Sequence, residues 1–172
     1  MRKEKYFSGL RLLVLDVDGT MTDGGIYYSD NGDEMKKFCA KDAVGLKAAN
    51  YGKIDVLVLT GRKSVALQRR MEELDVKKYF DGVKNKRLFL EKYMKLENLS
   101  KHQVAYVGDD LNDLEAMKLA IFVACPLDAA EEVVAIADYV SKYVGGNGVI
   151  RDVVRYILQC KGIWDDYVFN ME

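Results

Sequence analysis

The chain has 172 residues, 49% of them hydrophobic and 31% charged, which is the balance of an ordinary globular protein large enough to bury one core. Its 26 basic and 27 acidic side chains give a formal net charge of −1, so no overall positive field attracts nucleic acid or an anionic membrane surface. No apolar run approaches the length of a membrane-spanning helix. We therefore expect one domain over residues 1–172, with neither nucleic acid nor a membrane as a partner.

The cysteines and the first residues indicate a cytoplasmic protein. No metal-ligand spacing relates Cys39, Cys125 and Cys160, and their odd number favours reduced thiols. Residues 1–8 are charged and then aromatic, without the apolar centre of a secretion signal. The single histidine, His102, lies in a polar link, so His-based triads and His-rich zinc sites are not expected.

The first predicted strand ends in two carboxylates. Leu12–Leu15 is a continuous apolar run, typical of a strand that is buried on both faces of a parallel sheet. Asp16 and Asp18 follow it, and Gly19 then allows a sharp turn. Ligands bind beyond the carboxyl ends of such strands, so paired carboxylates there suggest a metal or a substrate cation. A solvated Asp-Gly turn is the alternative, whereas the spacing excludes a calcium loop.

Predicted strands and helices alternate along the rest of the chain, apart from one hairpin. Residues 30–32 (Asp-Asn-Gly) form a hairpin signal, which places an insertion at about residues 24–38. The further predicted strands are 54–59, 79–83, 104–107, 121–124 and 139–140. The predicted helices are 42–50, 64–74, 86–96, 112–119, 128–136 and 149–160. Asp128 and Glu131 predict a capping box, and residues 161–172 form a tail. The alternation predicts a doubly wound, three-layer α/β fold with a parallel sheet.

Polar side chains follow the ends of three predicted strands, and a fourth polar cluster begins a helix. The sets are Asp16 with Asp18, Thr60 with Gly61 and Arg62, Gly108 with Asp109 and Asp110, and Lys84 to Lys86. Strand ends of a parallel sheet meet at one edge, so we expect one site, and three carboxylates there suit magnesium best. One carboxylate can attack a phosphoryl group while a second moves protons. A threonine hydroxyl, the Gly61 amide and a lysine can hold the phosphoryl oxygens.

These segments resemble the four motifs of the haloacid dehalogenase superfamily of phosphatases, over about residues 10–160. The matching segments are Asp16-Val17-Asp18-Gly19-Thr20, Thr60, Lys86 and Gly108-Asp109-Asp110-x-Asn112-Asp113. The resemblance implies that Asp16 is the nucleophile and Asp18 the general acid/base. It also implies phosphate contacts from Thr60 and Lys86. It further implies a magnesium site of Asp16, the Asp18 carbonyl and Asp109, supported by Asp110 and Asp113.

Further segments are similar to the 3-deoxy-D-manno-octulosonate 8-phosphate phosphatase family. They are residues 22–32, 60–64, 104–113 and the glycine motif of residues 145–148. The resemblance implies a phosphomonoesterase of lipopolysaccharide precursor synthesis, with a small sugar acid phosphate as substrate. It also implies a capless homotetramer whose hairpins associate at its centre. Independently, only about forty residues separate the first two strand ends, too few for a lid domain.

Two residues bear on the substrate. Phosphatases of nine-carbon keto-deoxy sugar acids tend to have Glu where this chain has Arg62, and arginine suits the carboxylate of the eight-carbon acid. Asn147 stands where the family often has Arg, which weakens a contact of this segment with an anionic substrate. Two alternatives stay open. One is a phosphatase of a nine-carbon (KDN or sialic acid type) 9-phosphate. The other is a non-catalytic oligomerisation domain related to those of sialic acid cytidylyltransferases.

Several candidate residues also have simpler interpretations. Thr60 could cap the helix that follows it, and Arg62 could be a solvated charge at the start of that helix. Lys84 is a rival to Lys86 as the phosphate-binding lysine. The carboxylates of Asp110 and Asp113 could serve only to stabilise the N-terminal dipole of a helix.

Overall fold

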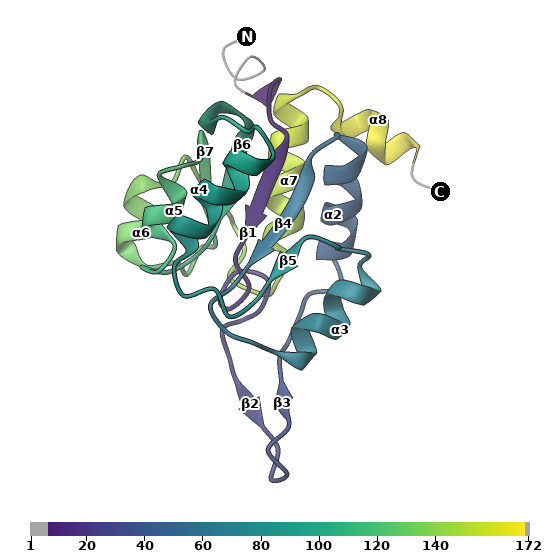
Figure 1. Ribbon diagram of the computed structural model, residues 1–172. Helices are drawn as coiled ribbons and strands as arrows, with labels where there is room; N and C mark the ends of the chain where they lie inside the picture. Colours follow the sequence, from purple (N-terminus) through teal and green to yellow (C-terminus); the bar gives the residue numbers. More distant parts are fainter. Residues whose placement is uncertain (1–6, 171–172) are drawn as a thin grey trace.

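The computed structural model describes residues 7–170 and has the predicted three-layer α/β architecture (Figure 1). Its central sheet has six parallel strands in the order β5-β4-β1-β6-β7-β8. The strands are β1 (Leu12–Leu15), β4 (Asp55–Leu59), β5 (Tyr79–Phe80), β6 (Val104–Val107), β7 (Phe122–Cys125) and β8 (Tyr139–Val140). Because β1 lies between β4 and β6, the strand order reverses at β1, and ligands of open α/β sheets bind at such a point.

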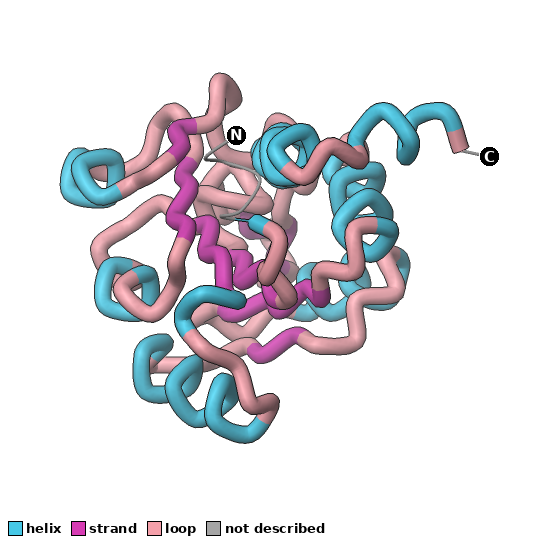
Figure 2. The backbone as a smooth tube through the Cα atoms, turned by 90° about the horizontal axis from the view of Figure 1, so that it is seen from above, coloured by secondary structure: helices cyan, strands magenta, loops and turns pink. Residues whose placement is uncertain are grey.

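Helices cover both faces of the sheet, as the view from above shows (Figure 2). One layer consists of α2 (Asp42–Tyr51), α3 (Val65–Glu73), α7 (Val149–Cys160) and α8 (Trp164–Phe169). The other layer consists of α4 (Lys86–Leu96), α5 (Leu114–Met117) and α6 (Glu131–Ile136), and a 3-10 helix, η1 (Lys101–Gln103), precedes β6. Side chains of a strand alternate between faces, so Leu13 and Leu15 enter the first core and Leu12 and Val14 the second.

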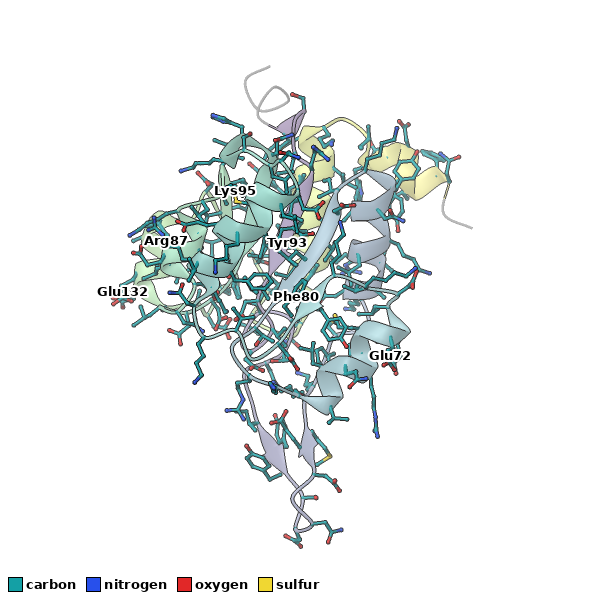
Figure 3. The ribbon with its side chains drawn as sticks, viewed as in Figure 1. Glu72, Phe80, Arg87, Tyr93, Lys95 and Glu132 are labelled. Carbon is teal, nitrogen blue, oxygen red and sulfur yellow. The ribbon has the colours of Figure 1, made fainter. Side chains whose placement is uncertain are left out.

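Aromatic side chains pack beside the edge strand β5. The Phe80 ring centroid lies 4.7 Å from that of Phe89 and 6.4 Å from that of Tyr93, both on α4. Figure 3 shows Phe80 and Tyr93 near one another, whereas Glu72 and Lys95 lie on the exposed sides of their helices. These ring contacts hold the short strand β5 against α4.

A β-hairpin projects from the carboxyl end of the sheet (Figure 1). It consists of β2 (Tyr27–Tyr28), β3 (Glu34–Met35) and the turn between them, and its strands pair antiparallel. An isolated bridge between Thr22 and Phe38 closes its base. The side chains of Tyr27, Tyr28 and Met35 are exposed, so the hairpin carries an apolar surface away from the core.

Helices α2 and α7 pack unusually closely. A Cβ on Gly45 of α2 would lie 2.6 Å from the Arg151 Cα of α7, so only glycine allows this approach. The buried carboxylate of Asp42 accepts the Arg151 backbone N–H at 3.0 Å, and burial raises the pKa of Asp42 to about 6. The start of α7 is thereby fixed directly after the glycine segment of residues 145–148.

Two predicted helices are shorter in the structure by three residues or more. The helix predicted at 112–119 corresponds to α5. It begins only at Leu114, because the residues before it form a turn in which the Asp113 N–H donates to the Asp110 carbonyl at 3.0 Å. The helix predicted at 128–136 is α6, and its predicted capping box is wrong. The Asp128 carboxylate instead accepts the Gly145 N–H at 2.9 Å, so a tertiary contact takes the capping side chain.

Some sequence-based expectations concern residues outside the described range. The expectation that residues 1–8 contain no secretion signal depends mostly on residues 1–6, which lie outside the described range. The last two residues of the predicted tail, 171–172, also lie outside it. Within residues 7–170, no helix has both the length and the apolar character needed to cross a membrane.

Candidate active site

The loop after β1 buries the first carboxylate. Asp16 is 3% exposed, and its N–H donates to the Val107 carbonyl of β6 at 2.9 Å. Gly19 has a φ of +88°, and a Cβ there would lie 2.0 Å from Oδ2 of Asp109. Glycine is therefore required for the turn to pass this close to the end of β6.

The C-terminal glycine segment packs directly on this loop. The Gly146 N–H donates to the Thr20 carbonyl at 3.2 Å. A Cβ on Gly145 would lie 2.0 Å from the Gly19 carbonyl oxygen, so the two backbones are in contact with no room for a side chain. The shape of the loop around Asp16 thus depends on residues far away in the sequence.

Lys86 brings a buried positive charge to Asp16. Asn85 caps α4 by accepting the Leu88 N–H at 2.9 Å, which places Lys86 in the first turn. The Lys86 Nζ lies 2.6 Å from Oδ1 of Asp16 and 2.6 Å from Oδ1 of Asp113. The rival Lys84 is exposed, so Lys86 is the lysine beside Asp16.

Two hydroxyl groups orient the other carboxylates. The hydroxyl of Tyr106, on the face of β6 that packs against α4 and α5, donates to Oδ1 of Asp113 at 2.6 Å. The Thr20 hydroxyl donates to Oδ1 of Asp109 at 3.0 Å. Such donors behind a carboxylate fix its direction toward a ligand.

Asp16, Asp109 and Asp113 form a carboxylate cluster, in which one oxygen of each lies within 4.8 Å of the others. Burial and the charge of Asp113 raise the pKa of Asp109 to about 6, and the same two causes raise the pKa of Asp16 well above its ordinary value. Oδ2 of Asp113 is buried and has no hydrogen-bond partner among the described residues. Hard oxygen donors, an unpartnered oxygen and excess negative charge fit a divalent cation such as Mg2+.

The other predicted site residues lie around this cluster. Asp18 is partly exposed, and its carboxylate forms an ion pair with Lys36, which follows β3. Buried Thr60 lies at the carboxyl end of β4, and a Cβ on Gly61 would meet nothing nearer than the Val83 carbonyl at 3.7 Å. The backbone at Gly61 is therefore open to a ligand.

Thr60 is not the cap of the following helix, because Ser64 occupies that position. The Ser64 hydroxyl accepts the Leu67 N–H of α3 at 3.3 Å. Among the described residues, the Thr60 hydroxyl accepts one long contact of 3.5 Å, from the Arg62 N–H, which leaves its own proton for another acceptor.

Arg62 and Asp110 have contacts away from the carboxylate cluster. The Arg62 guanidinium donates to the Tyr28 hydroxyl and to Oε2 of Glu34, both on the hairpin and both at 3.3 Å. Asp110 is exposed, and its Oδ1 accepts the N–H of Leu111 at 2.7 Å. Arg62 thus links the site to the hairpin, and Asp110 acts locally within its turn.

Three residues with contacts in the site were not assigned roles from the sequence. They are Thr20, Lys36 and Tyr106. Tyr106 had a signal, because a tyrosine in a fully buried strand needs an acceptor for its hydroxyl. No sequence signal pointed to Lys36, since the sequence around this short hairpin does not show whether Lys36 or Lys37 turns inward.

Comparisons with known proteins identify the family of this chain. Residues 33–120 match the family model of haloacid dehalogenase-like hydrolases. The 3-deoxy-D-manno-octulosonate 8-phosphate phosphatase KdsC of Escherichia coli K12 is 35% identical over 157 residues, which are 91% of this chain and 84% of the relative. The chain belongs to the haloacid dehalogenase-like hydrolases. The KdsC of Haemophilus influenzae is 34% identical over 92% of this chain and 88% of its own length.

Solved structures of haloacid dehalogenase-like hydrolases share the whole fold. The 3-deoxy-D-manno-octulosonate 8-phosphate phosphatase of Moraxella catarrhalis, in complex with magnesium, phosphate and KDO, has a TM-score of 0.93 and 32% identity, covering 99% of this chain and 98% of that one. A cobalt-bound form of the Haemophilus influenzae phosphatase has a TM-score of 0.88 and 34% identity, covering 96% of each chain. Both relatives hold a divalent metal, the class of ion that the carboxylate cluster fits.

We expect Mg2+ to stabilise the chain in a pH-dependent way. A carboxyl group whose pKa is higher in the folded state than in the unfolded state stabilises the fold at pH values below its unfolded-state pKa. This contribution is lost as the pH rises through the folded-state pKa, which is about 6 for Asp109. The bound ion offsets this loss. At one hundred times its Kd and pH 7.5, Mg2+ should add about 2.7 kcal/mol, or roughly 5 to 10 °C in Tm, measured by scanning calorimetry.

At pH 5 the carboxylate cluster binds protons in place of the ion, so the increase in Tm should be smaller. The Asp109→Asn variant is the control and should lose most of the increase at pH 7.5. An equal increase at both pH values, or in that variant, would place the ion elsewhere.

Proposed function

We propose that this chain is a Mg2+-dependent phosphomonoesterase that hydrolyses 3-deoxy-D-manno-octulosonate 8-phosphate, in lipopolysaccharide precursor synthesis. The observation that carries the proposal is the buried Asp16 carboxylate, in contact with Lys86 and beside two further carboxylates. A carboxylate held in this way can accept a phosphoryl group. The named activity of the KdsC relatives supports the substrate.

In the first half of the reaction, Asp16 forms an aspartyl-phosphate. Oδ1 of Asp16 accepts from Lys86, which leaves Oδ2 to bond to phosphorus while the bond from phosphorus to the sugar oxygen breaks. Asp18 gives its proton to the leaving alcohol oxygen. The Thr60 hydroxyl, the Gly61 N–H and the Lys86 ammonium donate to the phosphoryl oxygens and offset their charge.

In the second half, Asp18 acts as a base. It takes a proton from a water molecule, whose oxygen bonds to phosphorus while the bond to Asp16 breaks. Inorganic phosphate leaves, and both carboxyl groups return to their starting protonation states. Each aspartate thus serves one role, Asp16 in covalent bonding and Asp18 in proton transfer.

The carboxylate cluster and the Asp18 backbone carbonyl would hold Mg2+. When bound, the ion supplies positive charge that offsets the negative charge of the phosphoryl oxygens. Thr20 and Tyr106 keep Asp109 and Asp113 oriented for this purpose through their hydrogen bonds.

We further propose that residues 1–172 form one catalytic domain, which works as a homotetramer in the cytoplasm. The exposed Tyr27, Tyr28 and Met35 of the projecting hairpin support a subunit contact there. A neighbouring subunit would also exclude water from the site, over which residues 7–170 form no lid domain. Cys39, Cys125 and Cys160 are all free thiols, as expected in a reducing compartment. The native mass of the purified chain tests the tetramer.

A phosphate-release screen over sugar acid phosphates, with Mg2+ and with a chelator, tests the proposed function. We expect kcat/KM on the eight-carbon 8-phosphate to exceed that on a nine-carbon 9-phosphate by at least about ten-fold. The chelator should abolish release. A preference for the nine-carbon acid would correct the substrate, and release from no phosphomonoester would favour a non-catalytic domain.

A further inference from the structure

A lysine directly after the hairpin contacts the proposed general acid/base. After β3, the chain returns to the carboxyl end of the sheet, where Phe38 forms a bridge with Thr22 in the loop after β1. Neighbouring side chains of this extended segment point in opposite directions. The side chain of Lys36 is 1% exposed, although its backbone lies nearer the surface, whereas that of Lys37 is 54% exposed. Lys36 is therefore an inward-facing cation.

Lys36 contacts two carboxylates. Its Nζ forms an ion pair with Oδ1 of Asp18 and lies 3.9 Å from Oε1 of Glu34. Oε2 of Glu34 accepts from Arg62 at 3.3 Å. Burial of an ammonium group is costly unless partners compensate for the lost hydration, so Lys36 and Asp18 hold each other in place. The acid/base is thus anchored to the hairpin.

We infer that Lys36 is a positioning residue for Asp18. The inference deepens the proposed function and rests on it, because it gives Asp18 the proton-transfer role. With Oδ1 of Asp18 held by Lys36, Oδ2 is the oxygen that exchanges the proton with the leaving alcohol. Proton transfer depends strongly on such orientation. Lys36 lies outside the four motif segments, so the hairpin contributes to the chemistry as well as to assembly.

The experiment compares two esters in single-turnover release of the leaving group. An alkyl ester, such as the sugar acid phosphate or glycerol phosphate, needs the proton from Asp18. 4-Nitrophenyl phosphate does not, because nitrophenolate leaves as a stable anion. Lys36→Met removes the charge at similar length, and Lys36→Arg keeps it. Lys37→Met removes the exposed neighbouring charge and is the matched control.

We expect Lys36→Met to slow release from the alkyl ester by about 10- to 100-fold, and nitrophenolate release by less than about 3-fold. Lys36→Arg should recover part of the alkyl rate, and Lys37→Met should stay within about 2-fold of the wild type for both esters. Equal slowing of both esters, or slowing of neither, would overturn the inference. Circular dichroism checks folding. If Lys36→Met does not fold, Lys36→Gln replaces it with the same expectations.

The wild-type chain separates this inference from the proposed function. Hydrolysis of glycerol phosphate but not of the sugar acid phosphate would contradict the proposed substrate alone, and glycerol phosphate then decides the role of Lys36. Hydrolysis of neither alkyl ester would contradict the proposed function and the inference together.

Discussion

The Asp16→Asn variant is expected to lose phosphatase activity by at least about 1,000-fold while keeping its fold. An amide oxygen does not form the covalent phosphoryl intermediate, but it can still accept a hydrogen bond from Lys86. Burial raises the pKa of Asp16, so a neutral amide removes a charge that the fold disfavours, and Lys86 keeps its buried ion pair with Asp113. The unfolding midpoint in urea at pH 8 should therefore not fall. Phosphate release and urea unfolding measure the two effects.

Asp165→Asn is the control for this substitution, because Asp165 is exposed in the first turn of α8. It should leave both activity and stability near those of the wild type. Turnover of substrate by Asp16→Asn at the wild-type rate would contradict the assignment of Asp16 as the nucleophile.

Replacing Lys86 with methionine should both inactivate and destabilise the protein. The variant leaves the buried carboxylates of Asp16 and Asp113 without their shared cation. Removing one partner of a buried ion pair costs about 3 to 5 kcal/mol in the free energy of unfolding. Activity should fall by at least about 100-fold, because the lysine also offsets charge on the phosphoryl oxygens. Urea unfolding and phosphate release are the measurements.

The stability loss in Lys86→Met should depend on pH. The charge of Lys86 lowers the pKa of Asp16, so its removal raises that pKa further. A carboxyl with a raised pKa loses its stabilising contribution as pH rises, so the deficit should be larger at pH 8 than at pH 5. Lys84→Met, on an exposed lysine two residues earlier, should change stability by no more than about 0.5 kcal/mol. Equal midpoints for Lys86→Met and the wild type would contradict the buried ion pair.

The parts of the fold that the sequence predicted well are those set by local patterns. The apolar run of β1 identified a strand buried on both faces, and the polar residues after β1, β4 and β6 indicated a shared edge. That edge brings Asp16 and Asp109 together, as the strand order requires. The predicted bounds of α4 agree with the structure because Asn85 supplies a local cap.

The features that escaped prediction depend on contacts between distant segments. Asp128 has the spacing of a capping residue, but its carboxylate binds Gly145. Arg62 is predicted to bind a substrate carboxylate, and its sequence position gave no sign that its guanidinium also donates to Tyr28 and Glu34 of the hairpin. Lys36 and Asp18 meet because the segment after β3 returns to the loop after β1, where Phe38 forms a bridge with Thr22. A local pattern gives no information on which of several polar partners a long side chain selects.

The backbone contact between the glycine segment and the loop after β1 has a consequence for synthesis on the ribosome. Asp16 leaves the ribosome well before Gly145 and Gly146, yet the loop that follows Asp16 packs against these two glycines. A nascent chain that ends before this segment lacks that support, even when β1, β4 and β6 are complete. Catalytic competence should therefore arise late in translation, and a premature stop codon upstream of Gly145 should yield a polypeptide without turnover.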